Sequence, residues 1–92
     1  MLSKIPLKLK NKEDIDKEIL RAGLIAELDA VNLYEQMAAM TENENIKKIL
    51  LDIAREEKTH VGEFEALLLK LDEEQAKELE KGKEEVREEL GE

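Results

Sequence analysis

Three side chains could hold a metal ion: Glu57 and His60, which form a Glu-x-x-His motif, and Glu27. A spacing of three residues places Glu57 and His60 on one side of a helix. Burying carboxylates is costly unless a counter-charge or a metal compensates them. Carboxylate oxygens with one imidazole suit iron, manganese or zinc, and the absence of thiolates argues against a structural zinc site.

These residues interrupt two rows that are otherwise apolar and have the spacing of a helix face. Neither row contains a Lys or Arg, although Arg21 and Arg55 lie on neighbouring faces, so a salt bridge to the carboxylates remains an alternative to a metal. The first row is Leu20, Leu24, Glu27, Val31, Tyr34 and Ala38, and the second is Ile46, Leu50, Ile53, Glu57, His60, Phe64, Leu67 and Leu71.

The ligand set is half of a known type of centre. In helical di-iron proteins a lone Glu from one helix matches each Glu-x-x-His motif, and a full site needs two of each. This chain has one of each in its apolar rows, so two facing copies would complete a site. The alternative is a non-catalytic helical assembly module, in which Glu27, Glu57 and His60 form a buried polar network that fixes register.

The elements that must position these residues are predicted to be helices. Asn11 is a candidate cap for a helix that reaches about Met40. Residues 41–44 resemble a capping box for a second helix that ends near residue 71, and residues 72–75 repeat that pattern before a third, acidic segment. The predicted fold is all-α: a long antiparallel two-helix hairpin with a short C-terminal helix.

Composition limits the function classes. The chain has 92 residues, enough for one small domain, and 24 acidic against 15 basic residues give a net charge of −9. Such an acidic surface argues against binding nucleic acid, and the apolar runs are too short to span a membrane. The sequence therefore predicts a soluble cytoplasmic protein. Within it we distinguish an extended basic arm (1–12), the hairpin (13–71) and an acidic C-terminal helix (72–92).

The first predicted helix is apolar on more than one side, because Ile15, Ile19, Ala22 and Ala26 form a second row. A two-helix hairpin with one short helix cannot cover both rows. We therefore expect the chain to form oligomers with copies of itself.

Residues 26–36 (Ala26-Glu-Leu-Asp-Ala-Val-Asn-Leu-Tyr34-Glu-Gln) and 54–60 (Ala54-Arg-Glu-Glu-Lys-Thr-His60) resemble the encapsulated ferritins, a branch of the ferritin-like superfamily. The likeness covers roughly residues 14–71 and is greatest to archaeal members fused ahead of an encapsulin shell protein. It implies a half-ferritin completed by dimerisation, with dimers associated into a ring, typically a decamer. The chain ends in residues 85–92, which do not resemble the family's targeting peptide, so we expect a domain that continues into a shell protein.

The resemblance also implies a function: oxidation of Fe(II) to Fe(III) with dioxygen, supplying iron for mineral storage inside an encapsulin nanocompartment. Glu27, Glu57 and His60 match the family's iron ligands, two irons per dimer, and Tyr34 matches a tyrosine near the catalytic site. Asp29 matches one carboxylate of a proposed iron-access route, whereas Ala26 stands where some members have its second acid. A di-iron peroxidase like rubrerythrin ranks last, because the chain has no cysteine for an iron–sulfur partner.

Overall fold

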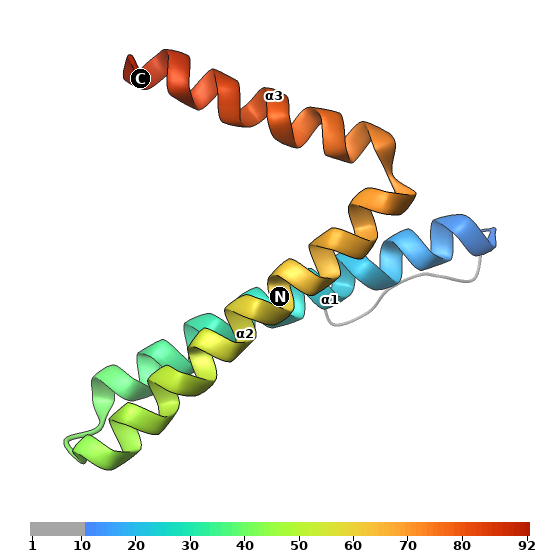
Figure 1. Ribbon diagram of the computed structural model, residues 1–92. Coiled ribbons are helices and arrows are strands. Elements are labelled where there is room, and N and C mark those ends of the chain that lie inside the picture. The colour runs from blue at the N-terminus through green and yellow to red at the C-terminus, as the bar shows by residue number, and fades with distance from the viewer. Residues whose placement is uncertain (1–10) are drawn as a thin grey trace.

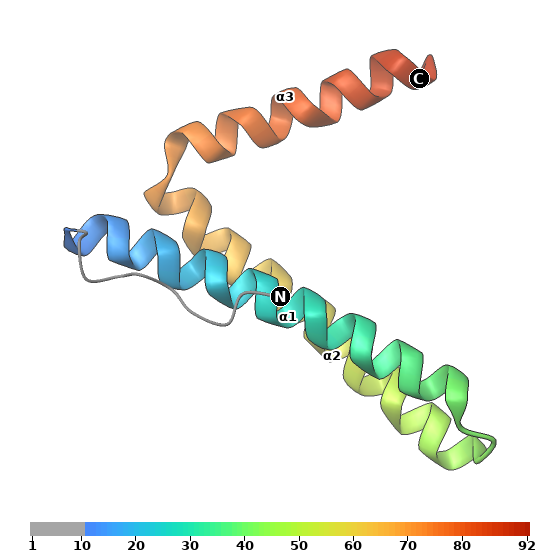
Figure 2. The same cartoon turned by 180° about the vertical axis from the view of Figure 1, so that it is seen from behind.

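The computed structural model describes residues 11–92 as three α-helices without a strand. Helices α1 (Lys12–Met40) and α2 (Glu44–Leu71) lie side by side and antiparallel, and α3 (Glu73–Leu90) projects from the end of α2 (Figure 1). The view from behind shows the same sharp corner between α2 and α3 (Figure 2). The predicted all-α fold, a hairpin with a short C-terminal helix, is confirmed.

Two of the three predicted helix starts are capped as expected. The side chain of Asn11 accepts a hydrogen bond from the backbone N–H of Asp14, and Asp72 accepts one from the backbone N–H of Gln75, both at 2.9 Å. These bonds satisfy backbone donors that a helix start leaves without a partner. Helix α3 also continues through Gly82, so this glycine does not break it.

The predicted capping box at the start of α2 is wrong. Thr41 instead ends α1, and the N-cap of α2 is Asn43, whose side chain accepts from the backbone N–H groups of Asn45 and Ile46. The Thr41 hydroxyl accepts a hydrogen bond from the backbone N–H of Asn43 at 3.1 Å. Asn caps helices at least as well as Thr, and it lies closer to the first turn.

The hairpin has a small core of Val31, Ala38, Ala54 and Leu68. The most deeply buried residues of α2, Ala54 and Leu68, therefore lie beside the predicted apolar row and not on it. Both ends of that row are open: Ile46 is 50% exposed and Leu71 is 39% exposed. Much apolar surface stays uncovered in the single chain, at Ile19, Ile25, Leu28, Leu33, Met40, Ile46, Ile49, Leu51, Leu67, Leu71, Val86 and Leu90.

Gly23 allows α1 and α2 to approach closely. A Cβ atom at this position would lie 2.5 Å from Cε1 of Phe64, so the ring occupies the space that any other residue would fill. The same test at Gly62 and Gly82 finds no atom within 4 Å. Gly23 is therefore a packing requirement of the hairpin.

We expect Gly23→Ala to be less stable than Gly82→Ala, which is the matched control. Both changes remove a helix glycine and gain roughly 1 kcal/mol from helix propensity. Only Gly23→Ala must displace the Phe64 ring, and overpacking of this kind costs about 1–3 kcal/mol. Urea unfolding followed by circular dichroism measures the difference, and equal stabilities of the two variants would contradict the packing role.

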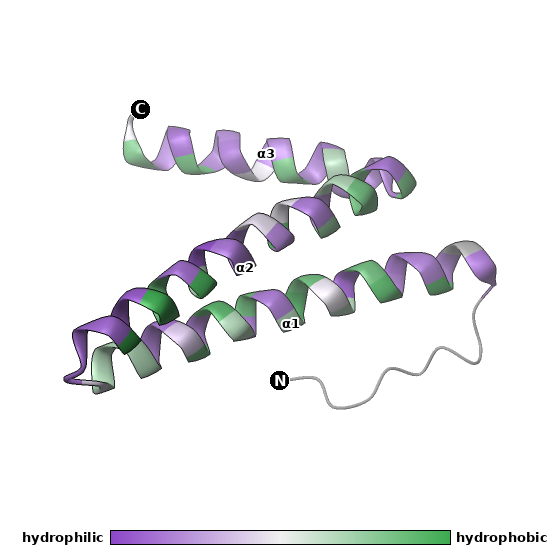
Figure 3. Cartoon of the chain, turned by 60° about the horizontal axis from the view of Figure 1, so that its bottom comes forward, coloured by the Kyte–Doolittle hydropathy of each residue, from purple (hydrophilic) through white to green (hydrophobic). Residues whose placement is uncertain are grey.

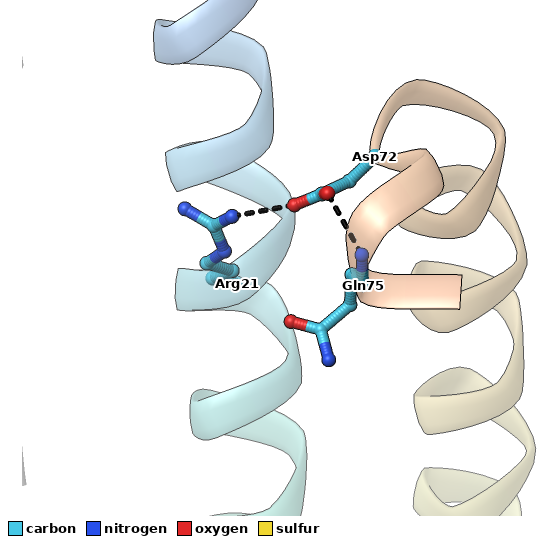
Figure 4. A network of polar contacts seen from close by, with 3 residues as sticks. All are labelled: Arg21, Asp72 and Gln75. Atoms are coloured by element: carbon cyan, nitrogen blue, oxygen red, sulfur yellow. Dashed lines mark hydrogen bonds and ion pairs between the residues drawn. The ribbon is translucent and has the colours of Figure 1, made fainter. Parts of the chain in front are cut away.

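An ion pair holds the corner between α2 and α3 against α1. Nη2 of Arg21 donates to Oδ2 of Asp72 at 2.7 Å, while the other carboxylate oxygen caps α3 through Gln75 (Figure 4). Only 12% of the Asp72 side chain is exposed. The hydrogen bond from the Gln75 backbone lowers the pKa of the Asp72 carboxyl below its ordinary value of 3.8, aided by the hydrogen bond from Arg21 and the charge of Lys17 and opposed by burial.

We expect Asp72→Asn to reduce stability at pH 7, with the difference from wild type shrinking in acid. Because the pKa of Asp72 is lower in the folded chain, its contribution is present above pH 3.8 and is lost as the pH falls through the folded value. Thermal unfolding at pH 7 and in steps below pH 4 tests this, with the exposed Asp29→Asn as control. A difference that persists unchanged in acid would refute the charge effect.

The basic arm predicted for residues 1–12 lies almost wholly outside the described residues, since only Asn11 and Lys12 are described and Lys12 begins α1. The three-part division of the chain stays a prediction. Across residues 11–92, no helix is both long and apolar enough to cross a membrane.

Candidate metal centre

The hairpin brings Glu27, Glu57 and His60 together. Glu27 comes from the middle of α1, and the other two come from consecutive turns of α2. Each residue offers a ligand atom within 4.8 Å of those of the other two. Nδ1 of His60 lies 3.4 Å from Oε2 of Glu27 and 3.5 Å from Oε2 of Glu57. One cation could contact all three groups after small side-chain movements.

The burial of Glu27 favours a cation at this place. Its side chain is 20% exposed, but its Oε2 is enclosed and accepts no hydrogen bond. A carboxylate oxygen that is removed from water and accepts no hydrogen bond is costly, and a coordinated cation would compensate it. The enclosed oxygen is therefore what distinguishes this cluster from an ordinary solvated group of acids.

The two arginines that could have neutralised the acids are used elsewhere. Arg21 pairs with Asp72 at the corner, and Arg55 pairs with Asp52 on its own helix. Lys58, the residue after Glu57, pairs with Glu35 at 3.1 Å. Among the described residues, no Lys or Arg is therefore seen to pair with Glu57. The alternative of a salt bridge from Arg21 or Arg55 to the metal-site carboxylates is weakened, because both arginines pair with other acids.

The group is open on one side. The His60 side chain is 44% exposed, against 18% for Glu57, because the ligand row lies at the edge of the contact between α1 and α2. An ion held by these three residues would keep coordination positions free for further ligands. This geometry suits a site that a second protein surface completes.

Two further residues from the sequence prediction lie outside this group. Tyr34 is half-buried on α1, two turns from Glu27, or about 10 Å along the helix. Asp29 is exposed, and its two-residue offset from Glu27 places it on a different side of α1. Their predicted roles, near the catalytic site and on an iron-access route, stay predictions.

The match to a solved structure decides the family. The chain is 56% identical to the encapsulated ferritin domain of Pyrococcus furiosus, whose crystal structure it matches with a TM-score of 0.86 over 99% of this chain and 90% of that one. The sequence also matches the rubrerythrin family over residues 18–91. The chain belongs to the rubrerythrin family and to its encapsulated ferritins.

Two curated relatives of this chain are longer proteins. A ferritin-like–encapsulin shell fusion protein of Pyrococcus furiosus is 66% identical over 80 residues, which cover 87% of this chain and 23% of that protein. The encapsulin nanocompartment cargo protein EncC of Myxococcus xanthus is 44% identical over 57 residues, or 62% of this chain and 44% of that protein. The chain thus spans less than half the length of each of these relatives. The family predicted from the sequence motifs is confirmed.

Proposed function

We propose that this chain is a ferroxidase, which oxidises Fe(II) to Fe(III) with dioxygen at a di-iron site shared by two copies. The enclosed Oε2 of Glu27, 3.4 Å from Nδ1 of His60 and without a hydrogen bond, is the observation that carries the proposal. Glu27, Glu57 and His60 supply half of the ligand set of a helical di-iron centre. The open side of the group is where a second copy would supply the other half.

Each residue has a role that follows from its chemistry. The neutral imidazole of His60 binds one iron, and the carboxylates of Glu27 and Glu57 chelate or bridge. Negatively charged oxygen ligands stabilise Fe(III) relative to Fe(II), which favours loss of an electron. Two Fe(II) ions give one electron each to dioxygen, and two protons complete one molecule of hydrogen peroxide. Iron is thus the substrate, and the Fe(III) product leaves for mineral growth.

Tyr34 and Asp29 have secondary roles in this proposal. Tyr34, which is half-buried on the same helix as Glu27, would relay an electron or orient a ligand of the site. Asp29 is exposed and would form part of a route by which iron reaches the site, with Ala26 in place of a second acid.

The names of the relatives support the proposal that this activity takes place in a compartment. One is a shell fusion protein and the other is a nanocompartment cargo protein, so we infer that this domain works inside an encapsulin shell and supplies iron for storage there. We further infer that its dimers associate into a ring, with a decamer as the expected size.

Native mass spectrometry with and without anaerobic Fe(II) tests the shared site, because it counts chains and metal ions together. We expect assemblies with even numbers of chains that bind about one iron per chain, the ratio of two ions per paired site. His60→Ala should lose the iron. Assemblies that never bind iron would refute the ferroxidase proposal and leave a structural helical module.

A further inference from the structure

The contact between Gly23 and Phe64 lies one helical turn from the candidate metal centre. Gly23 precedes Glu27 by four residues on α1, and Phe64 follows His60 by four residues on α2. Because the two helices are antiparallel, both steps lead toward the end of the hairpin where α1 begins (Figure 1). Four residues of an α-helix rise about 6 Å, so the Phe64 ring packs against α1 at about this distance along the hairpin from the metal ligands.

This contact leaves no spare space between the two helices. A Cβ atom at Gly23 would lie 2.5 Å, 2.7 Å and 2.8 Å from Cε1, Cδ1 and Cζ of Phe64. Three atoms of the half-buried ring therefore occupy the space in which any other side chain would begin. A ring of fixed shape on one helix and the smallest residue on the other determine how closely the two helices approach, because packed side chains transmit any change in volume to the backbone.

The metal ligands reach across the same gap. Nδ1 of His60 lies 3.4 Å from Oε2 of Glu27 on the opposite helix. Zinc and metal ions of similar size bind imidazole nitrogen and carboxylate oxygen at about 2.0–2.2 Å, so two tetrahedral ligands of one ion lie about 3.4 Å apart. The separation across the gap is thus the one that a single ion requires. The distance of 3.5 Å from His60 to Oε2 of Glu57 depends instead on the geometry of α2 alone.

The hairpin is also closely packed on the other side of the ligands. Val31, four residues after Glu27, is 8% exposed, and Ala54, three residues before Glu57, is 2% exposed. Figure 3 shows hydrophobic and hydrophilic residues interleaved along both helices in this way. The ligands therefore lie between this core and the Phe64 ring. If the ring pushed α1 outward, the helix would pivot about the core and carry Glu27 away from α2.

We propose that Gly23 and Phe64 form a spacer that holds Glu27 and His60 at the separation that one metal ion requires. Both are positioning residues, because neither offers a ligand atom and both act on the ligands through the spacing of α1 and α2. The inference rests on the proposed metal centre and extends it, since it makes the affinity of the site depend on two residues that do not bind the ion.

Gly23→Ala in the 92-residue chain tests the spacer with Co(II) as the probe. Co(II) has the charge of Fe(II) and binds the same ligand types, and its visible absorption changes with ligand geometry. Isothermal titration calorimetry should show Co(II) binding about tenfold or more weaker than in wild type, because loss of the residues that support a metal site costs about 10–100-fold in affinity. The absorption band should change as well. Gly62→Ala, at a glycine with no atom within 4 Å, should bind Co(II) like wild type.

A smaller side chain at position 64 should restore the site. In the double variant Gly23→Ala with Phe64→Leu, the new methyl group takes space that the ring has left. Its Co(II) affinity should recover most of the loss, and its absorption band should return toward that of wild type. Phe64→Leu alone removes the spacer and should also weaken binding, so the two changes compensate each other in a double-mutant cycle. If Gly23→Ala does not fold, tighter binding by the double variant than by Phe64→Leu alone is the result expected.

Ala38→Gly separates positioning from stability. Ala38 is 2% exposed on α1, about three turns beyond Glu27, and glycine there weakens the helix without contacting the ring. This variant should keep the wild-type Co(II) affinity and absorption band, and circular dichroism should show that all variants are helical.

Three results would each overturn the spacer alone: wild-type affinity in Gly23→Ala, an equal loss of affinity in Ala38→Gly, or no recovery in the double variant. His60→Ala is the test of the metal centre itself and should lose Co(II) binding. If wild type binds no Co(II), or if His60→Ala binds it like wild type, the proposed metal centre fails and the spacer fails with it.

Discussion

His60→Ala is expected to lower the rate of aerobic Fe(II) oxidation about a hundredfold or more, with the helices intact. The imidazole is the only nitrogen ligand of the candidate centre, and its Nδ1 lies within 3.5 Å of both carboxylates. Changes outside the ligand set already cost about 10–100-fold in metal affinity or activity, so loss of a ligand should cost more. Glu27→Gln should have a similar effect, because it removes the charge at the enclosed position.

Stopped-flow absorbance of Fe(III) formation under excess dioxygen measures this loss. Glu56→Ala is the matched control, because Glu56 is exposed and precedes Glu57 directly. It should oxidise iron at the wild-type rate, and circular dichroism should show equal helix content in all variants. Wild-type rates in both His60→Ala and Glu27→Gln would eliminate the assignment of the site.

Much of the candidate site follows from sequence periodicity alone. A carboxylate and an imidazole three residues apart, in a row with apolar neighbours, indicate a helix face that is neither solvated nor simply hydrophobic. Glu27 stands out in the same way on α1. The hairpin then brings the two rows together, and their ligand atoms meet within 4.8 Å.

The remaining details depend on contacts between distant residues, which periodicity does not encode. Arg21 and Asp72 are 51 residues apart, so nothing local indicates that their ion pair fixes the corner of α3. Gly23 looks like an ordinary helix glycine until the Phe64 ring is placed against it. Both contacts depend on how far one helix is rotated and shifted relative to the other.

The same rotation explains where the predicted apolar row differs from the observed core. A row of three- and four-residue steps is wide enough to pack through its centre or along one edge. The helices pack along an edge, which buries Ala54 and Leu68 and leaves His60 partly open. The proposed shared site depends on this opening, because a ligand in the centre of the seam would be closed to a second copy.

We expect Glu27→Leu to raise the stability of the metal-free chain while abolishing iron binding. The wild-type side chain keeps an enclosed oxygen without a hydrogen bond, and such a group is costly. Leu fills similar space and has no polar atom, so the gain should be about 1 kcal/mol or more. Chemical unfolding in the presence of a chelator measures it. Glu56→Leu, at an exposed position, should change stability by no more than about 0.5 kcal/mol.

This variant separates the metal centre from the alternative of a structural polar network. If Glu27 mainly fixed the register of a non-catalytic module, Glu27→Leu would destabilise the metal-free chain, because it would leave His60 without a partner in the network. If the group is a metal centre, wild type should become more stable than Glu27→Leu once iron is present, which reverses the order found without metal. Wild type gains about 2.7 kcal/mol at a free iron concentration a hundred times the dissociation constant, and the variant gains nothing. Anaerobic unfolding with and without Fe(II) therefore distinguishes the two functions. The deciding quantity is the sign, in each condition, of the difference in free energy of unfolding between wild type and Glu27→Leu.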